Sequence, residues 1–268
     1  MIGTWLRRLH QADIRWSERY VLPTPLHPGF WVRRRLSAAV ALASTRARGV
    51  LLDVGCGQKP YAAVFRPHVS RYIGMDYSPA AGYRGNVADV CGDVAAIPIA
   101  TASVDTVLCT EVLEHVSDPD AVVREIARVL RPSGVVICTA PFVYPVHDLY
   151  DFFRYSPGTV AALMRRHGLT VDLERPLSGT ALTLAIMLNL YWFEIGFIWT
   201  KWLYLVGLVL RPVLWVLAAM VNLLGRVFEF VLPSTHLSFN HLTIGHQPGV
   251  PRAVDSRAHA PSSVAYVG

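Results

Sequence analysis

The sequence contains little charge and almost no lysine. Charged residues make up 16% of its 268 positions, and Lys59 and Lys201 are its only lysines. Soluble domains usually carry about 25% charged residues, so this chain is too apolar for an ordinary soluble domain. The net charge of +6 comes almost wholly from scattered arginines. Since no basic run is interleaved with aromatics, we expect no nucleic-acid partner and attribute the positive charge to genome composition together with a preference for membrane surfaces.

Closely spaced cysteines and metal-ligand patterns are also lacking. The cysteines form no C-x-x-C pair, and each falls in or beside an expected core strand: Cys56, Cys91, Cys109 and Cys138. We therefore expect small buried hydrophobic side chains, in a protein of a reducing cytosol. The histidines show no ligand spacing with neighbouring carboxylates or thiols, so the sequence predicts no metal site.

The N-terminus lacks a charged head followed by an apolar run, so we expect no signal peptide. Arginines at 33–35 before the apolar residues 36–43 imitate one, but they lie too far along the chain. Residues 1–48 are interpreted as a helix, a break at three prolines, and a second helix at 30–46. The first helix mixes apolar residues with arginines, which suits either a membrane interface or a sheet edge.

Alternating strands and helices are expected between residues 49 and 177. Short apolar runs that predict strands buried on both faces lie at 50–54, 72–76, 104–110 and 135–139. The expected fold is α/β: a doubly wound, mostly parallel, seven-stranded sheet. Its sixth strand would lie at 169–174, and an antiparallel seventh strand would lie within 234–247.

A glycine turn follows the first of these runs. Gly55 and Gly57 let the backbone approach a ligand without an intervening Cβ. The third glycine of a dinucleotide-binding motif is lacking, since residues 58–60 are Gln, Lys and Pro. Asp53 before the turn would also repel a pyrophosphate. These features disfavour a nicotinamide-dependent oxidoreductase.

The segment Asp-Val-Gly-Cys-Gly at 53–57 resembles the first motif of the class I S-adenosylmethionine-dependent methyltransferases, and the similarity continues with gaps to Leu177. The resemblance implies S-adenosylmethionine as cofactor, held by residues that include Asp53, Gly55, Cys56 and Gly57. Asp76 ends the second expected strand, where a carboxylate can accept both hydroxyls of a ribose. The resemblance also places Tyr77 beside the nucleoside.

Two further segments carry the resemblance. Gly-Asp-Val at 92–94 is similar to the family's third motif, in which the Asp93 side chain and the Val94 amide would read the adenine edge. Asp93 alone would otherwise be interpreted as a loop cap. Glu-Val-Leu-Glu-His at 111–115 resembles the segment that lines the sulfonium end of the cofactor, so Glu111 is expected there and His115 is interpreted as structural.

The loop after the fifth expected strand should carry the chemistry, because ligands of open α/β sheets bind beyond the carboxyl ends of the strands. Methylation of a hydroxyl requires alignment of the acceptor and removal of its proton. His147 is the candidate base, since imidazole titrates near neutral pH, and Asp148 or Asp151 would orient its ring. Arg154, with Asp148 and Tyr155, is expected to contact the acceptor and could hold a phosphate. Alternatively, Asp151 and Arg154 form a local ion pair, and His147 only bonds a carbonyl.

Long apolar runs fill residues 178–233. Charged residues interrupt these runs and Trp and Tyr border them, as is typical of a lipid headgroup zone. A spanning helix needs ~20 uncharged residues, so we favour helices that lie in one leaflet, or dip into it as a hairpin, over two full spans. A buried core or dimer interface is the other alternative. Residues 248–268 are expected to be a flexible tail.

The sequence thus predicts a membrane-associated, cytosol-facing methyltransferase with its core at 49–177. The expected reaction is O-methylation of a hydrophobic or lipid-linked small molecule or glycan. A noncatalytic protein that keeps the cofactor pocket and recruits partners at the membrane is the alternative. No residue pattern specifies an oligomeric state.

Overall fold

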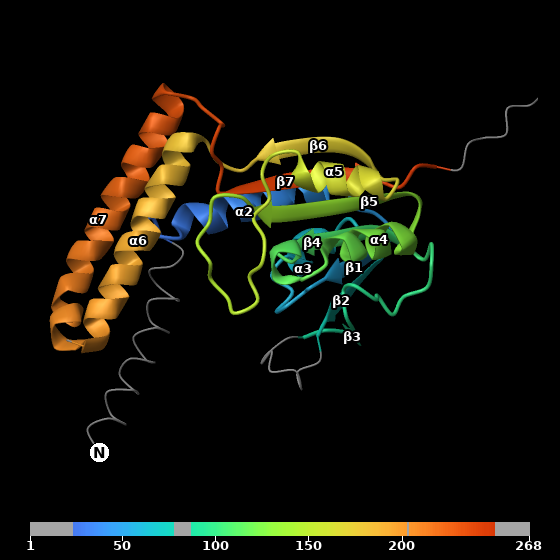
Figure 1. Cartoon of the computed structure of the whole chain (residues 1–268), viewed down its shortest axis with the longest axis horizontal. Coiled ribbons are helices and arrows are strands. Elements are labelled where there is room, and N and C mark those ends of the chain that lie inside the picture. The colour runs from blue at the N-terminus through green and yellow to red at the C-terminus, as the bar shows by residue number, and fades with distance from the viewer. Residues whose placement is uncertain (1–23, 78–86, 203, 250–268) are drawn as a thin grey trace, which may run out of the picture.

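The computed structural model describes residues 24–77, 87–202 and 204–249. Figure 1 shows a sheet with helices against both faces and a long helical hairpin at one end. The strands are β1 (Val50–Val54), β2 (Arg71–Asp76), β3 (Val90–Cys91), β4 (Val104–Thr110), β5 (Leu130–Pro141), β6 (Thr170–Pro176) and β7 (Asn240–His246). They form one seven-stranded sheet in the order β3-β2-β1-β4-β5-β7-β6. β7 is antiparallel to β5 and β6, and the other neighbouring strands pair in parallel, which confirms the predicted fold class.

Helices cover both faces because successive residues of each strand point to opposite sides. The helices of the sheet domain are α2 (Phe30–Ser44), α3 (Ala62–Phe65), α4 (Pro119–Val129) and α5 (Thr159–Arg166), with the short 3-10 helix η2 (Leu113–His115). Leu51 of β1 belongs to the hydrophobic cluster under α2 and α3. The next residue, Leu52, belongs to the cluster under α4 and α5. The strands therefore read as continuous apolar runs.

Two boundaries differ from expectation. β5 starts at Leu130, directly after α4, because Leu130 already pairs with Val104. The expected strand began only at residue 135. Cys91 is exposed on the edge strand β3, whereas the other three cysteines are buried as predicted. The expected first helix lies within residues 1–23 and most of the expected tail lies within 250–268, outside the described residues.

The hairpin consists of α6 (Thr180–Trp202) and α7 (Tyr204–Val231). β6 leads into α6, and α7 returns to β7, whose first residue, Asn240, pairs with Pro141 at the carboxyl end of β5. The hairpin therefore leaves the sheet at the edge where the parallel strands end, as Figure 1 shows.

A buried polar pair and a close helix approach hold the two hairpin helices together. The Asn189 side chain donates to Asn222 Oδ1 at 3.0 Å, and Asn222 donates to the carbonyls of Pro25 and His27. A Cβ added to Gly225 would lie 2.4 Å from the Cβ of Ala185, so only glycine permits this spacing.

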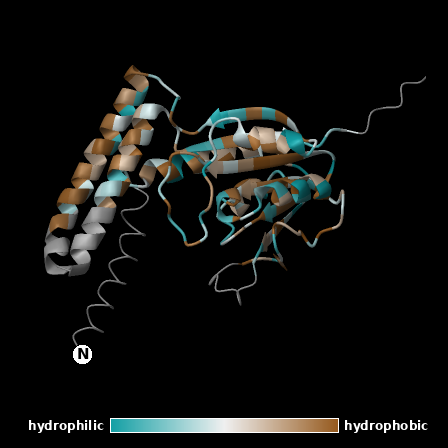
Figure 2. Cartoon of the chain, viewed as in Figure 1, coloured by the Kyte–Doolittle hydropathy of each residue, from teal (hydrophilic) through white to brown (hydrophobic). Residues whose placement is uncertain are grey.

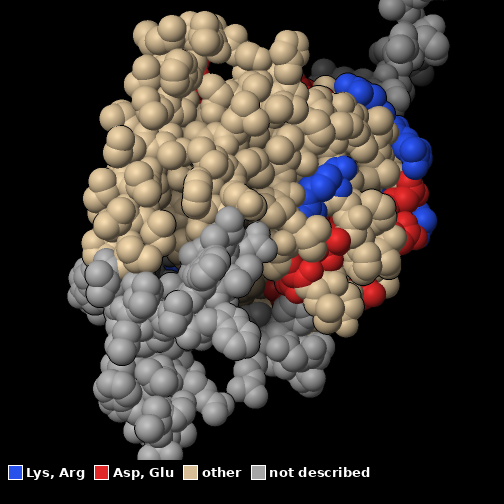
Figure 3. Space-filling view, turned by 60° about the vertical axis from the view of Figure 1, so that its left-hand side comes forward, with Lys and Arg blue, Asp and Glu red and all other residues tan. Residues whose placement is uncertain are grey.

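The outer surface of the hairpin is apolar (Figure 2). Exposed side chains along α7 include Met220, Leu223, Val227 and Phe230, which is 80% exposed. Where it is described, the hairpin is almost free of charge in Figure 3, whereas acidic and basic side chains gather over the sheet domain. Residues 212–231 are long and apolar enough to cross a bilayer, with a mean hydropathy of 1.7.

Candidate functional site

The glycine turn and Asp76 meet at the carboxyl ends of β1 and β2. Gly57 donates its amide to Asp76 Oδ2 at 2.7 Å, and the Tyr77 amide donates to the other carboxylate oxygen. Gly55 and Gly57 both have positive φ, of 68° and 49°. A Cβ on Gly55 would collide with Val112, whereas a Cβ on Gly57 would meet no atom within 4 Å among the described residues. The turn is thus closely packed on one side and open on the side where a ligand would approach.

Asp53 lies in β1, just before this turn. Its side chain is 2% exposed and accepts a hydrogen bond from the Tyr72 hydroxyl. Burial raises the pKa of Asp53 to about 7, against the opposing effect of the Tyr72 hydrogen bond. Cys56 is buried as well. Both residues were predicted to bind the cofactor, and the structure buries both side chains, with Asp53 bonded to the Tyr72 hydroxyl of β2.

The predicted adenine-side residues lie beyond β2 and β3. Asp93 is exposed and caps its loop by accepting the Ala95 amide at 2.8 Å, while the Val94 side chain is buried. Tyr77 is 39% exposed directly after Asp76. The site fits an adenosyl group. The open side of Gly57 supplies a backbone cradle, the Asp76 carboxylate an acceptor for the ribose hydroxyls, and Tyr77 an aromatic face.

Glu111 directly follows β4, with its backbone in the left-handed region at φ 54°. Its carboxylate accepts hydrogen bonds from the Thr139 hydroxyl on β5 and from the Asn240 side-chain Nδ2 on β7, each at 2.7 Å. Burial raises the pKa of Glu111, and these two donors oppose that shift. Because Val112 packs on Gly55, this segment lies directly against the cofactor turn.

Glu114 is a site residue that the sequence reasoning missed. Its side chain is 0% exposed, and neither carboxylate oxygen finds a hydrogen-bond partner in the described part of the chain. Burial, with the charge of Glu111 second, raises the pKa of Glu114 to about 9. A ligand atom of Glu114 lies within 4.8 Å of one from His115 and one from His147. We call these three residues the Glu–His cluster. The Glu-x-x-Glu-His spacing at 111–115 could have indicated Glu114 and His115 as site residues. His147 comes close to them only in the folded chain.

His147 lies on the loop between β5 and α5, which folds back over η2. Its Nδ1 lies 3.0 Å from Asp151 Oδ2, and the Asp151 carboxylate also accepts the His147 amide. The Nδ1 hydrogen bond goes to the Pro145 carbonyl at 3.3 Å, as in the alternative expected for His147, while Asp151 lies beside the ring and Asp148 accepts the neighbouring Leu149 amide. The pKa of Asp151 is held well below its usual range, chiefly by hydrogen bonds from Arg154.

Arg154 and Tyr155 are structural in this arrangement. All five donors of the Arg154 guanidinium are engaged: two bond Asp151, and three bond the carbonyls of Tyr144, Pro145 and Phe153. The expectation that Arg154 holds an anionic acceptor is therefore corrected, and the alternative of a local ion pair is what the structure contains. Tyr155 is 5% exposed and donates to the Leu113 carbonyl, so it lies in the core and not on an acceptor surface.

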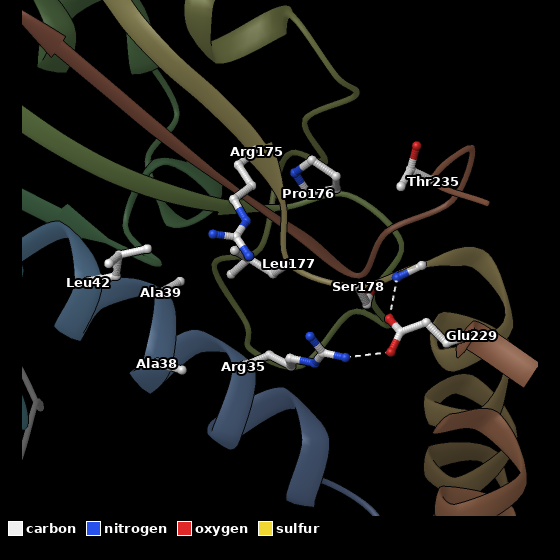
Figure 4. Close-up of a pocket in the computed structure, with 11 residues that line it drawn as sticks. Arg35, Ala38, Ala39, Leu42, Arg175, Pro176, Leu177, Ser178, Glu229 and Thr235 are labelled. Carbon is white, nitrogen blue, oxygen red and sulfur yellow. Dashed lines mark hydrogen bonds and ion pairs between the residues drawn. The ribbon is translucent and has the colours of Figure 1, made fainter. Parts of the chain in front are cut away.

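A separate pocket of about 440 Å³ lies between α2, the end of β6 and the base of α7. Figure 4 shows Glu229 of α7 between Arg35 of α2 and the Gly179 amide, which it accepts at 2.7 Å. None of the predicted site residues lines this pocket. These contacts attach the hairpin to the sheet domain.

Comparison with known proteins agrees with this geometry. A family profile described as "Methyltransferase domain" matches residues 52–138. A Mycolicibacterium smegmatis protein named as a probable S-adenosylmethionine-dependent methyltransferase is 34% identical over 125 residues, which cover 45% of this chain and 49% of the relative. A ubiquinone biosynthesis O-methyltransferase of Xanthomonas oryzae is 35% identical over 150 residues, 47% of this chain and 59% of the relative. The chain spans about half the length of these curated relatives.

Two solved structures share the fold over 81% of this chain. The [4+2]-cyclase SpnF matches with a TM-score of 0.51 and 19% identity over 81% of its length. A complex between the Trm112 methyltransferase activator of Haloferax volcanii and a methyltransferase contains a chain that matches with a TM-score of 0.50 and 20% identity over 90% of its length. The segment matched by the family profile holds the glycine turn, Asp76 and Glu111, and in this core the chain is similar to the S-adenosylmethionine-dependent methyltransferases.

Proposed function

We propose that this protein transfers a methyl group from S-adenosylmethionine to a hydroxyl of a hydrophobic or lipid-linked acceptor at the cytoplasmic face of a membrane. The observation that carries the proposal is the position of the Glu–His cluster. Two of its residues follow closely after Val112, which packs against Gly55 of the cofactor turn, and the cluster lies on the edge of the sheet from which the apolar hairpin emerges.

On the donor side, Gly57 and Asp76 would hold the adenosyl group. When bound, S-adenosylmethionine supplies an activated methyl group: the carbon–oxygen bond forms as the sulfur–carbon bond breaks, leaving neutral S-adenosylhomocysteine. The hydroxyl proton must pass to a base. His147 is suited to this because Nδ1 faces Asp151, which leaves Nε2 to accept the proton.

On the acceptor side, the loop that carries His147 presents an apolar surface. Val146 is 75% exposed and Leu149 is 84% exposed, and Tyr150, Phe152 and Phe153 follow on the same loop. A group of large exposed apolar side chains beside a site indicates that an apolar acceptor or a membrane surface covers them. The relative from Xanthomonas oryzae carries an O-methyltransferase name, which is consistent with transfer to oxygen.

The hairpin supports a location at the membrane. Among the side chains that the structure describes, the two helices expose large apolar groups, while Asn189 and Asn222 are buried between them and Glu229 accepts the Gly179 amide. A surface of this composition is stabilised when lipid replaces water around it.

The test is transfer of a labelled methyl group from S-adenosylmethionine into a bacterial membrane lipid extract by the purified full-length protein, followed by mass identification of the product. We expect a labelled lipid with a methyl ether, together with S-adenosylhomocysteine. The Asp76→Ala variant should lose this labelling. If the protein binds the donor but produces no S-adenosylhomocysteine with any extract fraction, the noncatalytic alternative replaces the proposal.

A further inference from the structure

We propose that Glu114, His115 and His147 form a binding site for one divalent first-row transition-metal ion. Their ligand atoms lie within 4.8 Å of one another, although His147 is on a different loop from the other two. Ligand atoms around one such ion lie about 3 to 3.5 Å apart, given metal–ligand distances of about 2.1 Å. Small rotamer adjustments, mainly of the exposed His147, would therefore close the site.

The buried carboxylate is the strongest sign of a missing ligand. The Glu114 side chain is fully buried, and its two oxygens lack a hydrogen-bond partner within the described residues. A buried polar group without a partner is costly, so native proteins rarely leave one. His115 Nε2 lies 3.7 Å from Glu114 Oε1, which is too far for a hydrogen bond and suits two ligands of one ion.

Both histidines are oriented to coordinate through Nε2. His115 Nδ1 lies 2.6 Å from the Tyr150 carbonyl oxygen, which can only accept, so Nδ1 carries the proton. His147 Nδ1 lies 3.0 Å from Asp151 Oδ2 and 3.3 Å from the Pro145 carbonyl oxygen, which are also acceptors. In each ring the lone pair is therefore on Nε2. An imidazole held by its other nitrogen to a carbonyl or carboxylate is the usual arrangement of a metal-binding histidine.

Two histidines and one carboxylate select the class of ion. Imidazole ligands suit Mn²⁺, Fe²⁺, Co²⁺ and Zn²⁺, whereas Mg²⁺ prefers oxygen ligands alone. Three protein ligands also leave coordination positions open. Resting on the proposed function, we infer that the acceptor hydroxyl binds there and loses its proton to solvent, because a bound cation lowers the pKa of a coordinated hydroxyl. In that state His147 is a ligand and not the base.

The test is equilibrium dialysis of the chelator-treated full-length protein against Mn²⁺, Zn²⁺ or Co²⁺, with the visible absorption of Co²⁺ as a second readout. We expect one ion per chain. Glu114→Gln and His147→Ala should weaken binding by about 100-fold, and Asp151→Asn, which contacts His147 and also pairs with Arg154, by about tenfold. His246→Ala is the matched control, because it removes a histidine that pairs with Asp172 outside the cluster.

The site is overturned if the unmodified protein binds these ions no more tightly than Glu114→Gln, or if His246→Ala weakens binding equally. Circular dichroism and thermal unfolding of each variant, without metal, exclude unfolding as the cause. Metal binding without methyl transfer would refute the proposed function and leave the site intact. Methyl transfer that survives in the chelator-treated protein, which binds no ion, would retain His147 as the base and refute the role of the ion in the reaction.

Discussion

At the residue scale, the site depends on a few positions that break the ordinary rules of backbone and burial. Gly57 holds a positive φ and leaves open space, among the described residues, where a side chain would stand. Glu111 adopts a positive φ without being glycine, which costs free energy and is found mainly at functional sites. Glu114 buries a carboxyl group without a protein partner in the described chain. All three lie at the carboxyl ends of β1 and β4.

Asp76→Ala should weaken S-adenosylmethionine binding by about 10- to 100-fold, because a hydrogen bond to a charged acceptor contributes about 1.5 to 3 kcal/mol. Titration calorimetry with S-adenosylmethionine measures this change. Asp172→Ala is the control, since it removes a carboxylate from β6 on the far edge of the sheet. Equal affinities for Asp76→Ala and the unmodified protein would contradict the assignment of the ribose position.

Asp53 makes stability depend on pH. Its pKa is about 7 in the folded protein and 3.8 in a model compound, so folding favours the protonated form. The resulting stability is present below about pH 4 and is lost as the pH rises through 7. The Asp53→Asn variant carries an amide that stays uncharged at any pH. Its stability should therefore rise by about 2 to 3 kcal/mol relative to the unmodified protein between pH 5 and pH 8.

Urea unfolding of both proteins at these two pH values measures the difference. Using the difference between the proteins removes the contributions of other titrating groups. A gap that is the same at pH 5 and pH 8 would show that Asp53 titrates normally in the folded state.

At the element scale, the hairpin is a packed unit of two helices attached at its base. Glu229 near the end of α7 contacts Arg35 of α2 and the Gly179 amide. Farther along, Asn222 bonds Asn189 across the hairpin, and Trp31 of α2 donates to the Asn222 carbonyl. The hairpin is thereby held in a defined direction relative to the sheet edge.

Gly225→Ala should destabilise the hairpin by about 1 to 3 kcal/mol, since the new Cβ would lie 2.4 Å from the Ala185 Cβ and overpacking costs energies of this size. Adding Ala185→Gly removes the opposing methyl group, so the double variant should be more stable than the sum of the two single effects predicts. Thermal unfolding in detergent micelles measures all three variants. Strict additivity would show that the helices do not meet at these residues.

At the scale of the whole molecule, the proposed methyl-transfer site and the proposed membrane contact lie at the same carboxyl edge of the sheet. The cofactor turn, the Glu–His cluster and the exposed loop after β5 lie there, and the hairpin starts and ends there. A membrane that covers the hairpin would therefore lie near the opening through which an acceptor enters.

Replacing Met220, Leu223 and Val227 together by glutamine should reduce binding to vesicles that contain anionic phospholipid by at least about tenfold. These side chains are 54%, 64% and 46% exposed, so their substitution removes apolar area that lipid would bury. Vesicle flotation measures the bound fraction, and Leu42→Gln on α2 is the control for loss of an exposed apolar side chain elsewhere. Unchanged flotation of the triple variant would argue against the hairpin as the membrane contact.

Most of the fold could be predicted from the sequence, because its local signals agree with one another. Apolar runs marked β1, β2 and β4. In the structure α4 starts at Pro119 after Asp118, which accepts the Ala121 amide at 3.0 Å, and both residue types favour a helix start. The Gly57–Asp76 pair was equally accessible, since a glycine turn after one strand and a carboxylate after the next must meet at one sheet edge.

Only the tertiary structure decided how the residues of the loop after β5 are used. Whether Arg154 faces an acceptor or Asp151 depends on where the loop carbonyls lie, and no local pattern records that. His147 follows Glu114 by a long stretch of chain that includes α4 and β5, so spacing alone predicted no metal ligands. Local sequence sets backbone conformation and apolar faces, whereas ligand sets that join separate loops arise only when the sheet brings its strand ends together.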